Sequence, residues 1–197
     1  VISVLTYSSD VLAATKDYRV DFFADPAQQF GFDQKKYAAW VNDYEVIQLA
    51  DSTNYWVPYK SLAAANQSGG AGSVTDVVLA QAKSPATLSD LSFVAVRNGE
   101  STPLVAQNLD DSTWQVTLTG LDESCYVYAL HNGDRIGKLW VKVLSPIEKE
   151  VVIVPVGNAA LAQTDAAALQ NQLNTIYAQA CVSFAVSFAD NYVSSTW

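Results

Sequence analysis

The chain has 197 residues, of which half are hydrophobic and 16% are charged, and this composition is sufficient for a packed globular core. The formal net charge is −9 and the lysines and arginines are scattered, so we expect no nucleic-acid partner and no anionic lipid surface. No apolar run approaches the length of a membrane-spanning helix, so we expect no membrane insertion. Ten Tyr, seven Phe and five Trp residues, set among many Val and Thr residues, favour strands as the main element.

Residues 1–72 form the first region that we distinguish, and its pattern predicts strands with one short helix. Weak alternation over residues 1–23 predicts two edge strands, and Pro26 ends the second. The alternating run 55–60 contains Pro58, which cannot donate to a strand ladder, so this run is predicted to be an edge strand. This region is therefore expected to be β-rich.

A short helix with an aromatic face is predicted at about residues 33–44, with Asp33 as its N-cap. Aromatic side chains in and after this helix have two interpretations: they pack on the core, or they form an exposed platform that binds carbohydrate. The candidate binding surface consists of Trp40, Tyr44, Tyr55, Trp56 and Tyr59.

Residues 73–145 have the densest strand signals, with turn residues such as Asn98-Gly99 and Asn132-Gly133 between them. The predicted strands cover residues 74–82, 91–97, 103–107, 113–119, 124–130 and 136–144. Short strands at such even spacing indicate an antiparallel β-sandwich of the immunoglobulin or fibronectin type III kind. The preceding Ser, Ala and Gly residues at 63–72 indicate a boundary or a long loop, with early proteolytic cleavage at 69–72.

Residues 148–197 are predicted to begin an α/β domain with a strand, a helix and a second strand, joined to the sandwich by a short hinge at 146–150. The run 151–156 is apolar throughout, which is typical of a strand buried on both faces. A helix of about 16 residues follows, and residues 182–188 alternate as a second strand. One helix shields one face, so the other must be covered by the sandwich, by a second copy of the chain or by the missing remainder of the α/β domain, and of these we expect the sandwich.

The sequence predicts no catalytic residue, no metal ligand and no cofactor in this chain. Its single histidine, His131, lies beside a predicted hairpin turn and has no partner at metal-ligand spacing. Acidic pairs such as Asp110-Asp111 lie in turns, where they bond to the backbone. Cys125 and Cys181 lie in strands without a nearby cation, so we expect two buried, reduced and unreactive thiols.

Two segments resemble a known family. The segments 149–158 and 173–184 resemble the opening of a zincin-type metallopeptidase domain. In large secreted or injected proteins of Bacteroidetes-type bacteria, an immunoglobulin-like region precedes this domain. Residues 137–143 are similar to the last strand of that region. The resemblance covers about a quarter of the chain and rests on apolar positions. The family's His-Glu-x-x-His helix has no counterpart here, so no catalytic or zinc-binding residue is carried over.

Three functions follow as hypotheses. In the first, the chain is a non-catalytic scaffold or targeting region of a secreted or injected effector, whose metallopeptidase-like part lies beyond it; enzyme activity of the parent is left open. The second is a free-standing adhesion or carbohydrate-binding module, and the third a small toxin or cargo of a contractile injection system. The absence of Met and of a signal-peptide pattern indicates a piece excised from a longer secreted protein. Its expected partner is another protein or the remainder of its own chain.

Overall fold

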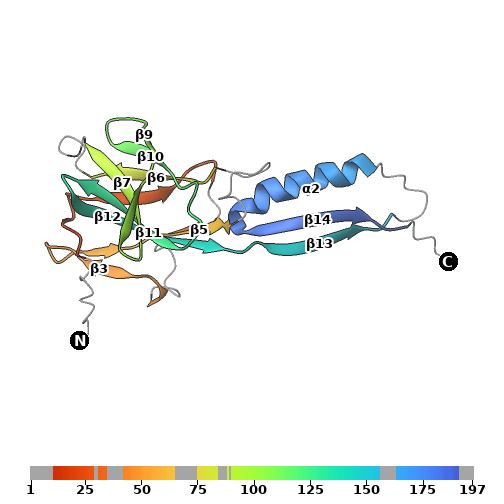
Figure 1. Ribbon diagram of the computed structural model, residues 1–197, viewed down its shortest axis with the longest axis horizontal. Helices are drawn as coiled ribbons and strands as arrows, with labels where there is room; N and C mark the ends of the chain where they lie inside the picture. Colours follow the sequence, from red (N-terminus) through yellow and green to blue (C-terminus); the bar gives the residue numbers. More distant parts are fainter. Residues whose placement is uncertain are drawn as a thin grey trace.

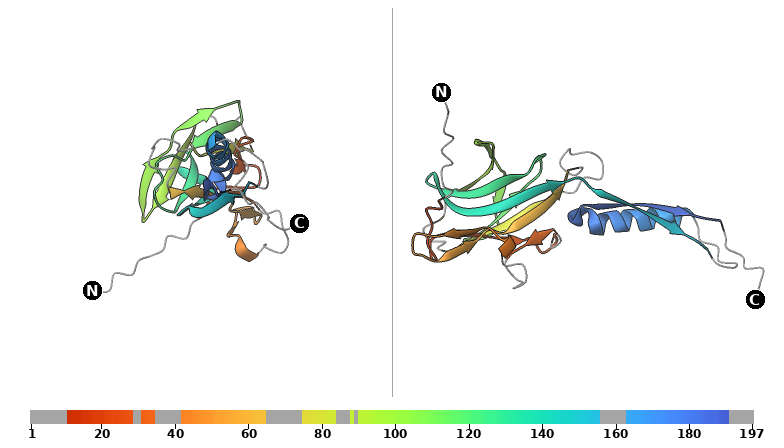
Figure 2. Two further views of the ribbon diagram at one scale, coloured as in Figure 1. Left: turned by 90° about the vertical axis from the view of Figure 1, so that its right-hand side faces the viewer. Right: turned by 90° about the horizontal axis from the view of Figure 1, so that it is seen from below.

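The protein is mainly β, with an elongated outline in which a broad body of strands continues into a narrow C-terminal extension (Figure 1). The computed structural model describes residues 11–28, 31–34, 42–64, 75–83, 88, 90–155 and 163–190. We call the described residues up to 144 the two-sheet body, and residues 147–190 the C-terminal arm. Figure 2 shows the arm extending away from the body along the long axis of the molecule.

The smaller of the two main sheets of the body has four strands and is antiparallel throughout. Its strands alternate between buried and half-buried residues. Its order is β1 (Val20–Ala24), β6 (Val77–Ala82), β10 (Thr113–Thr117) and β9 (Ala106–Asn108). The burial of every second residue places one face toward the core, as the period of a strand requires. Of the two edge strands predicted over residues 1–23, the second is confirmed, because β1 lies at one edge and ends before Pro26. Residues 1–10 lie outside the described residues.

The larger sheet has six strands. Its order is β2 (Phe32–Asp33), β5 (Tyr59–Ala63), β12 (Asp134–Leu144), β11 (Cys125–His131), β7 (Leu91–Arg97) and β8 (Glu100–Pro103). All neighbours are antiparallel except β5 and β12, which are parallel. The predicted hairpin turns are confirmed: Asn98 and Gly99 have φ of 50° and 87°, and Asn132 and Gly133 have φ of 52° and 86°, which is the backbone of a type I′ turn.

The inward side chains of both sheets form one core. Phe22 of β1 and Phe93 of β7 meet edge to face across the two layers, with ring centroids 6.3 Å apart. Gly137 of β12 lets β1 approach closely, because a Cβ at this position would lie 2.6 Å from the carbonyl oxygen of Val20. Strands before residue 72 and after residue 73 therefore belong to the same sheets and share the same core.

The segment around Pro58 differs from its prediction. β4 (Asn54–Trp56) pairs only with β3 (Val46–Gln48), whereas β5 begins at Tyr59 and lies between β2 and β12. The single edge strand predicted over 55–60 is therefore wrong, because Pro58 separates two strands that pair with different partners. Of the predicted helix at 33–44, Asp33 lies in β2, and residues 35–41 lie outside the described residues, as do 65–74.

The arm is formed by two parallel neighbouring strands with a helix between them in sequence. Its elements are β13 (Ile147–Ile153), α2 (Gln163–Tyr177), the 3₁₀ helix η3 (Ala178–Ala180) and β14 (Val182–Phe188). β13 begins earlier than predicted, so the hinge is reduced to Ser145 and Pro146, and residues 148–150 belong to the strand. α2 packs against β14, where Tyr177 meets Phe184 with ring centroids 5.2 Å apart.

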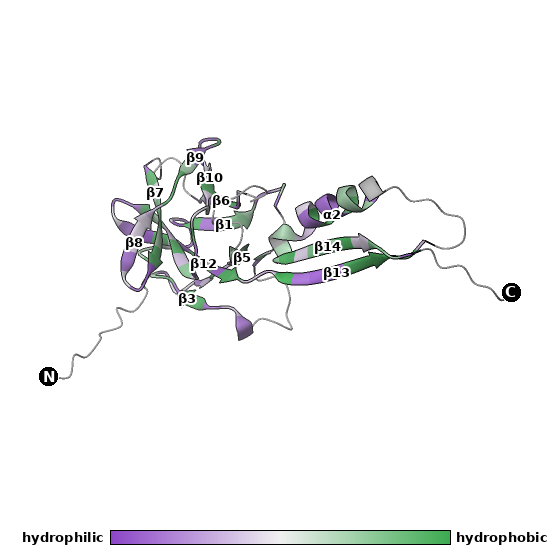
Figure 3. Cartoon of the chain, turned by 45° about the vertical axis from the view of Figure 1, so that its right-hand side comes forward, coloured by the Kyte–Doolittle hydropathy of each residue, from purple (hydrophilic) through white to green (hydrophobic). Residues whose placement is uncertain are grey.

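The prediction that residues 151–156 form a strand buried on both faces is wrong: β13 spans Ile147–Ile153, none of its residues is fully buried, and Val152 is 55% exposed. Paired positions share a face, and the face opposite to Phe184 carries Glu148 beside Ser183 and Glu150 beside Ala185. These small and charged side chains suit contact with water. Figure 3 shows this mixture as a hydrophilic stretch within β13 between hydrophobic ends.

The body does not cover the arm in the way we expected. The main contact between them is made by η3 on β5, and Val152 and Val154 of the arm remain 55% and 49% exposed. Cys181, in the left-handed conformation with φ of 57°, lies at this junction. The junction therefore fixes the base of the arm and leaves its far end in solvent.

Candidate functional site

The connection between β4 and β5 separates two hollows of similar size on the surface of the body. The first, of about 240 Å³, is lined by Arg19, Asp21, Phe22, Phe23, Gln34, Asn54, Tyr55, Trp56 and Pro58, and we call it the Trp56 hollow. The second, of about 230 Å³, is lined by Asp43, Tyr44, Glu45, Val57, Tyr59, Tyr126 and Trp140, and we call it the Trp140 hollow. The aromatic residues selected from the sequence are therefore divided between two places.

Tyr55 is a core residue and does not belong to an exposed binding surface. It is only 3% exposed, and its hydroxyl oxygen accepts a hydrogen bond from the backbone N–H of Lys138 at 3.1 Å and lies 2.9 Å from the carbonyl oxygen of the same residue. Burial raises the pKa of the Tyr55 hydroxyl well above its usual value. The interpretation of Tyr55 as part of a carbohydrate platform is therefore wrong, because its ring and its hydroxyl are used to join β4 to β12.

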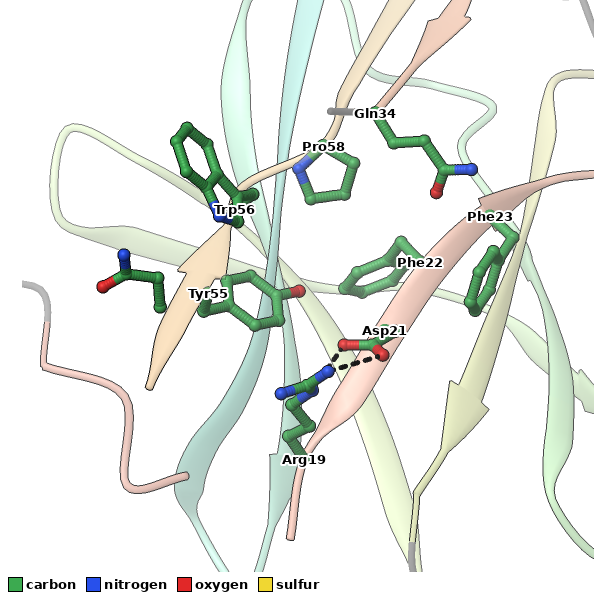
Figure 4. A pocket seen from close by; sticks show the side chains of 9 residues that line it. Arg19, Asp21, Phe22, Phe23, Gln34, Tyr55, Trp56 and Pro58 are labelled. Atoms are coloured by element: carbon green, nitrogen blue, oxygen red, sulfur yellow. Dashed lines mark hydrogen bonds and ion pairs between the residues drawn. The ribbon is translucent and has the colours of Figure 1, made fainter. Parts of the chain in front are cut away.

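The Trp56 hollow has two partly exposed aromatic side chains, Trp56 and Phe23, and a charged pair. Figure 4 shows Trp56 and Pro58 on one side, and on the other Arg19 with its Nε 2.8 Å from Oδ1 of Asp21. Asp21 also pairs with Lys83, whose Nζ is 3.3 Å from Oδ2. The charges in this hollow already pair with one another, so it offers a ligand little beyond the rings of Trp56 and Phe23.

The Trp140 hollow contains a row of three aromatic side chains from adjacent strands. Tyr59 of β5 is paired with Trp140 of β12, and Trp140 is paired in turn with Tyr126 of β11. Strand alternation places these three on the face opposite to Val127 and Val141, which are fully buried in the core. The three rings are half-buried, so the row is accessible at the surface of the six-stranded sheet.

The segment before β3 supplies the wall of this hollow. Asp43 is exposed, and Tyr44 donates a hydrogen bond from its hydroxyl to Oδ2 of Asp33 at 2.6 Å. Burial raises the pKa of the Tyr59 hydroxyl, which therefore stays protonated and able to donate at neutral pH. The hollow thus combines aromatic faces with an exposed carboxylate and a phenol donor. Of the sequence candidates, Tyr44 and Tyr59 meet here, whereas Trp40 lies outside the described residues.

A buried lysine controls the charge of the hollow. Lys138 has no exposed side-chain surface; its Nζ is 2.6 Å from Oε1 of Glu45 and 3.7 Å from the ring centroid of Tyr126. The ammonium therefore already takes the cation–π position on one Tyr126 face and neutralises Glu45. A second cation at the Tyr126 ring would meet this resident charge, so a neutral ligand suits this ring better. Aromatic faces flanked by a carboxylate and a phenol suit the apolar faces and hydroxyl groups of a sugar.

The geometry also limits the shape of the ligand. The ring centroids of Tyr126 and Trp140 are 4.5 Å apart, and their planes are inclined by 48°. The two rings therefore contact each other and present inclined faces, not a flat, coplanar platform. Such inclined faces suit a single sugar ring or a chain end better than the flat surface of a crystalline polysaccharide.

Sequence reasoning missed Tyr126 and Trp140, because they lie far along the chain from the aromatic cluster that attracted attention. A usable signal was present in their neighbours: Tyr126 and Trp140 alternate with Cys125, Val127, Leu139 and Val141, all of which are buried. In a strand, the residues that alternate with a core face point away from it. Two aromatic residues on that outer face indicate a candidate contact surface.

The residues considered for catalysis are placed apart. His131 is the last residue of β11, and its Nδ1 contacts the hydroxyl of Tyr18. Asp110 closes a turn by accepting hydrogen bonds from the N–H and the hydroxyl of Ser112, and these bonds lower its pKa. Asp122 pairs with Arg97 at 3.0 Å. Among the described residues, no group of three or more His, Cys, Asp or Glu side chains is arranged to hold a metal ion.

Both cysteines are free and buried, as predicted, although the environment differs from the prediction. Burial is the main cause that raises the pKa of the Cys125 thiol to about 11, and it also raises that of Cys181. The expectation that no cation lies near is wrong: Arg97 acts on Cys125 and Lys60 acts on Cys181, each lowering the pKa by less than burial raises it.

Comparisons with known proteins found no match: neither a protein-family model, nor a curated protein, nor a solved structure is similar to this chain. The resemblance to zincin-type metallopeptidases therefore remains an expectation from the sequence. In the part of the chain that the structure describes, no helix is long and apolar enough to cross a membrane.

Proposed function

We propose that this chain is a non-catalytic targeting region of a secreted multidomain protein, and that it binds carbohydrate in the Trp140 hollow. The observation that carries the proposal is the row of Tyr59, Trp140 and Tyr126 across three paired strands, with the carboxylate of Asp43 beside it. A sugar ring would stack on the accessible face of Trp140 or Tyr59, and Asp43 would accept hydrogen bonds from its hydroxyl groups.

The proposal includes a finer description of the fold. The two-sheet body is an immunoglobulin-like or fibronectin-like sandwich, and the arm is the opening βαβ unit of an α/β domain of zincin type that further sequence completes. Two facing sheets with one core and a parallel strand pair joined through a helix support this description. The parent reading frame tests it: it should continue past residue 197 into a helix with a His-Glu-x-x-His motif, and a frame that ends here would contradict it.

Carbohydrate binding is tested by titrating the purified chain with soluble neutral oligosaccharides built from glucose, N-acetylglucosamine, mannose or xylose, with tryptophan fluorescence and calorimetry as readouts. For a sugar that binds, Asp43→Ala should weaken binding about tenfold, because a hydrogen bond to a charged group is removed. Asp43 is exposed, so this variant should fold normally. Trp140→Ala should abolish binding.

The matched control is Trp56→Ala, which removes the tryptophan of the neighbouring hollow and should leave the affinity unchanged. If Trp56→Ala lost binding while Asp43→Ala kept full affinity, the ligand would bind in the Trp56 hollow, and the assignment to the Trp140 hollow would be wrong. A tetramethylammonium salt serves as the cationic probe. Its tight binding, with no oligosaccharide bound, would contradict the assignment of a neutral ligand.

A further inference from the structure

The interior of the two-sheet body contains a second lysine, paired with an aspartate. Lys60 lies in β5 of the six-stranded sheet, and Asp76 immediately precedes β6 of the four-stranded sheet. Their side chains are 0% and 1% exposed, and Nζ of Lys60 is 3.3 Å from Oδ1 of Asp76. The pair therefore connects the two layers of the body through its core.

Lys60 is poorly accommodated as an ion. An ammonium group has three donors, yet Nζ of Lys60 makes no hydrogen bond to any group in the described part of the chain. Removing two charges from water costs several kcal/mol per ion, and the mutual attraction offsets this cost only when further hydrogen bonds are made. Lys138 shows the difference: its Nζ bonds to Glu45, which is 36% exposed, and lies over the Tyr126 ring.

We propose that Lys60 and Asp76 become joined by an intramolecular isopeptide bond. A proton first passes from the ammonium to the carboxylate, a transfer that burial favours because both groups become neutral. The lone pair of the neutral amine then attacks Cγ of Asp76 and forms the C–N bond. The C–OH bond breaks, and the hydroxyl leaves with a proton from the nitrogen as one molecule of water. No electron is gained or lost, and no cofactor takes part.

The close approach of Lys60 and Asp76 favours this step. The fold holds the amine and the carboxyl in contact in a dry interior, and such placement acts as a very high effective concentration of one reactant for the other. The product is an amide without net charge, so the cost of burying two ions disappears. The bond would link β5 to the start of β6 in the four-stranded sheet. It would also restrict the unfolded chain, as a disulfide does. This inference does not depend on the proposed carbohydrate site.

The test is the intact mass of the purified full chain. We expect a mass lower than that of the sequence by one water molecule, and protease digestion should give one branched peptide that contains both Lys60 and Asp76. Full sequence mass after prolonged incubation of the folded protein, with Lys60 recovered in an ordinary linear peptide, would overturn the proposal.

Two variants locate the bond. Lys60→Arg should have its full sequence mass, because a guanidinium does not form the amide. Lys138→Arg, a change at the second fully buried lysine among the described residues, should still lack one water molecule. Persistence of the deficit in Lys60→Arg, or its loss in Lys138→Arg alone, would show that the water is lost elsewhere and would also overturn the assignment. The wild-type mass decides the question even when a variant folds poorly.

Discussion

The two-sheet body and the C-terminal arm bury their apolar side chains to very different extents. In the body, residues such as Phe93 and Leu139 are 2% and 0% exposed, whereas in the arm Val152 and Ile176 are 55% and 51% exposed. Two sheets can enclose a core between them, but two strands with one helix cannot. From this comparison we expect the body to fold by itself, and the arm to depend on its junction with the body and on a further cover.

The arm nevertheless satisfies much of its backbone. The side chain of Asn174 bonds to both the N–H and the carbonyl of Phe184, at 2.6 and 3.1 Å, and Gln170 accepts from the N–H of Val186 at 2.8 Å. These residues lie one helical turn apart on α2, so two amides cover the edge of β14 that faces away from β13. A strand that extends this sheet would therefore add to β13, whose outer edge is not occupied by these amides.

Separating the two parts should give the largest effect. A fragment of residues 1–145 should unfold cooperatively, whereas a fragment of residues 146–197 should show no cooperative transition, because ordering each residue costs about 1–2 kcal/mol and the arm buries little to offset it. Circular dichroism during thermal unfolding measures both. A cooperative transition in a monomeric 146–197 fragment would show that the arm does not need the body.

Truncating an aromatic ring in each part should give the next largest difference. Phe93→Ala should lower the free energy of unfolding by about 3–5 kcal/mol, because it empties a fully enclosed site in the core. The matched change in the arm, Phe184→Ala, should cost only about 1–2 kcal/mol, since Phe184 is half-buried. Urea unfolding of the full chain measures both, and equal losses would mean that the arm is packed as well as the body.

Local sequence patterns predicted the elements better than their partners. The strands at 91–97 and 182–188 and both Asn-Gly turns agree with the structure, because alternation and left-handed turn residues act over a few positions. The parallel pairing of β5 with β12 joins residues about eighty positions apart, and no local pattern specifies it.

The candidate site was predicted only in part for the same reason. Tyr44 and Tyr59 belong to one local aromatic cluster, but Tyr126 and Trp140 reach the hollow through the register of three strands. Tyr55 has the same local pattern as Tyr59, yet it is buried by contacts with β1 and β12. Residue type alone could not separate these two tyrosines, because their exposure depends on tertiary packing.

Removing a side-chain amide of α2 should have a smaller and more local effect on stability. Asn174→Leu should lower the stability of the arm by about 1 kcal/mol per lost hydrogen bond and should leave the body unchanged. Hydrogen exchange of the Phe184 N–H should become faster, while that of core amides in β11 should stay the same. Asn171→Leu, a change on the same helix at a residue with an exposed side chain, is the control. Unchanged exchange at Phe184 would mean that the edge is protected by packing and not by the amide.

The thiols should give the smallest effect, and they probe the core and the junction separately. The folded-state pKa of Cys125 is raised to about 11, above the value of about 8.5 for a free thiol. The stability that depends on the protonated thiol is therefore complete below about pH 8.5 and is lost as the pH rises toward 11. Labelling of Cys125 with a thiol reagent should be slow at pH 8 and should accelerate toward pH 11.

Cys181, whose pKa is also raised, should show the same direction of pH dependence. Because it lies at the junction, its labelling should increase first under mild denaturant. Rapid labelling of both thiols at pH 8 in the folded protein would contradict the burial of the core at Cys125 and of the junction at Cys181.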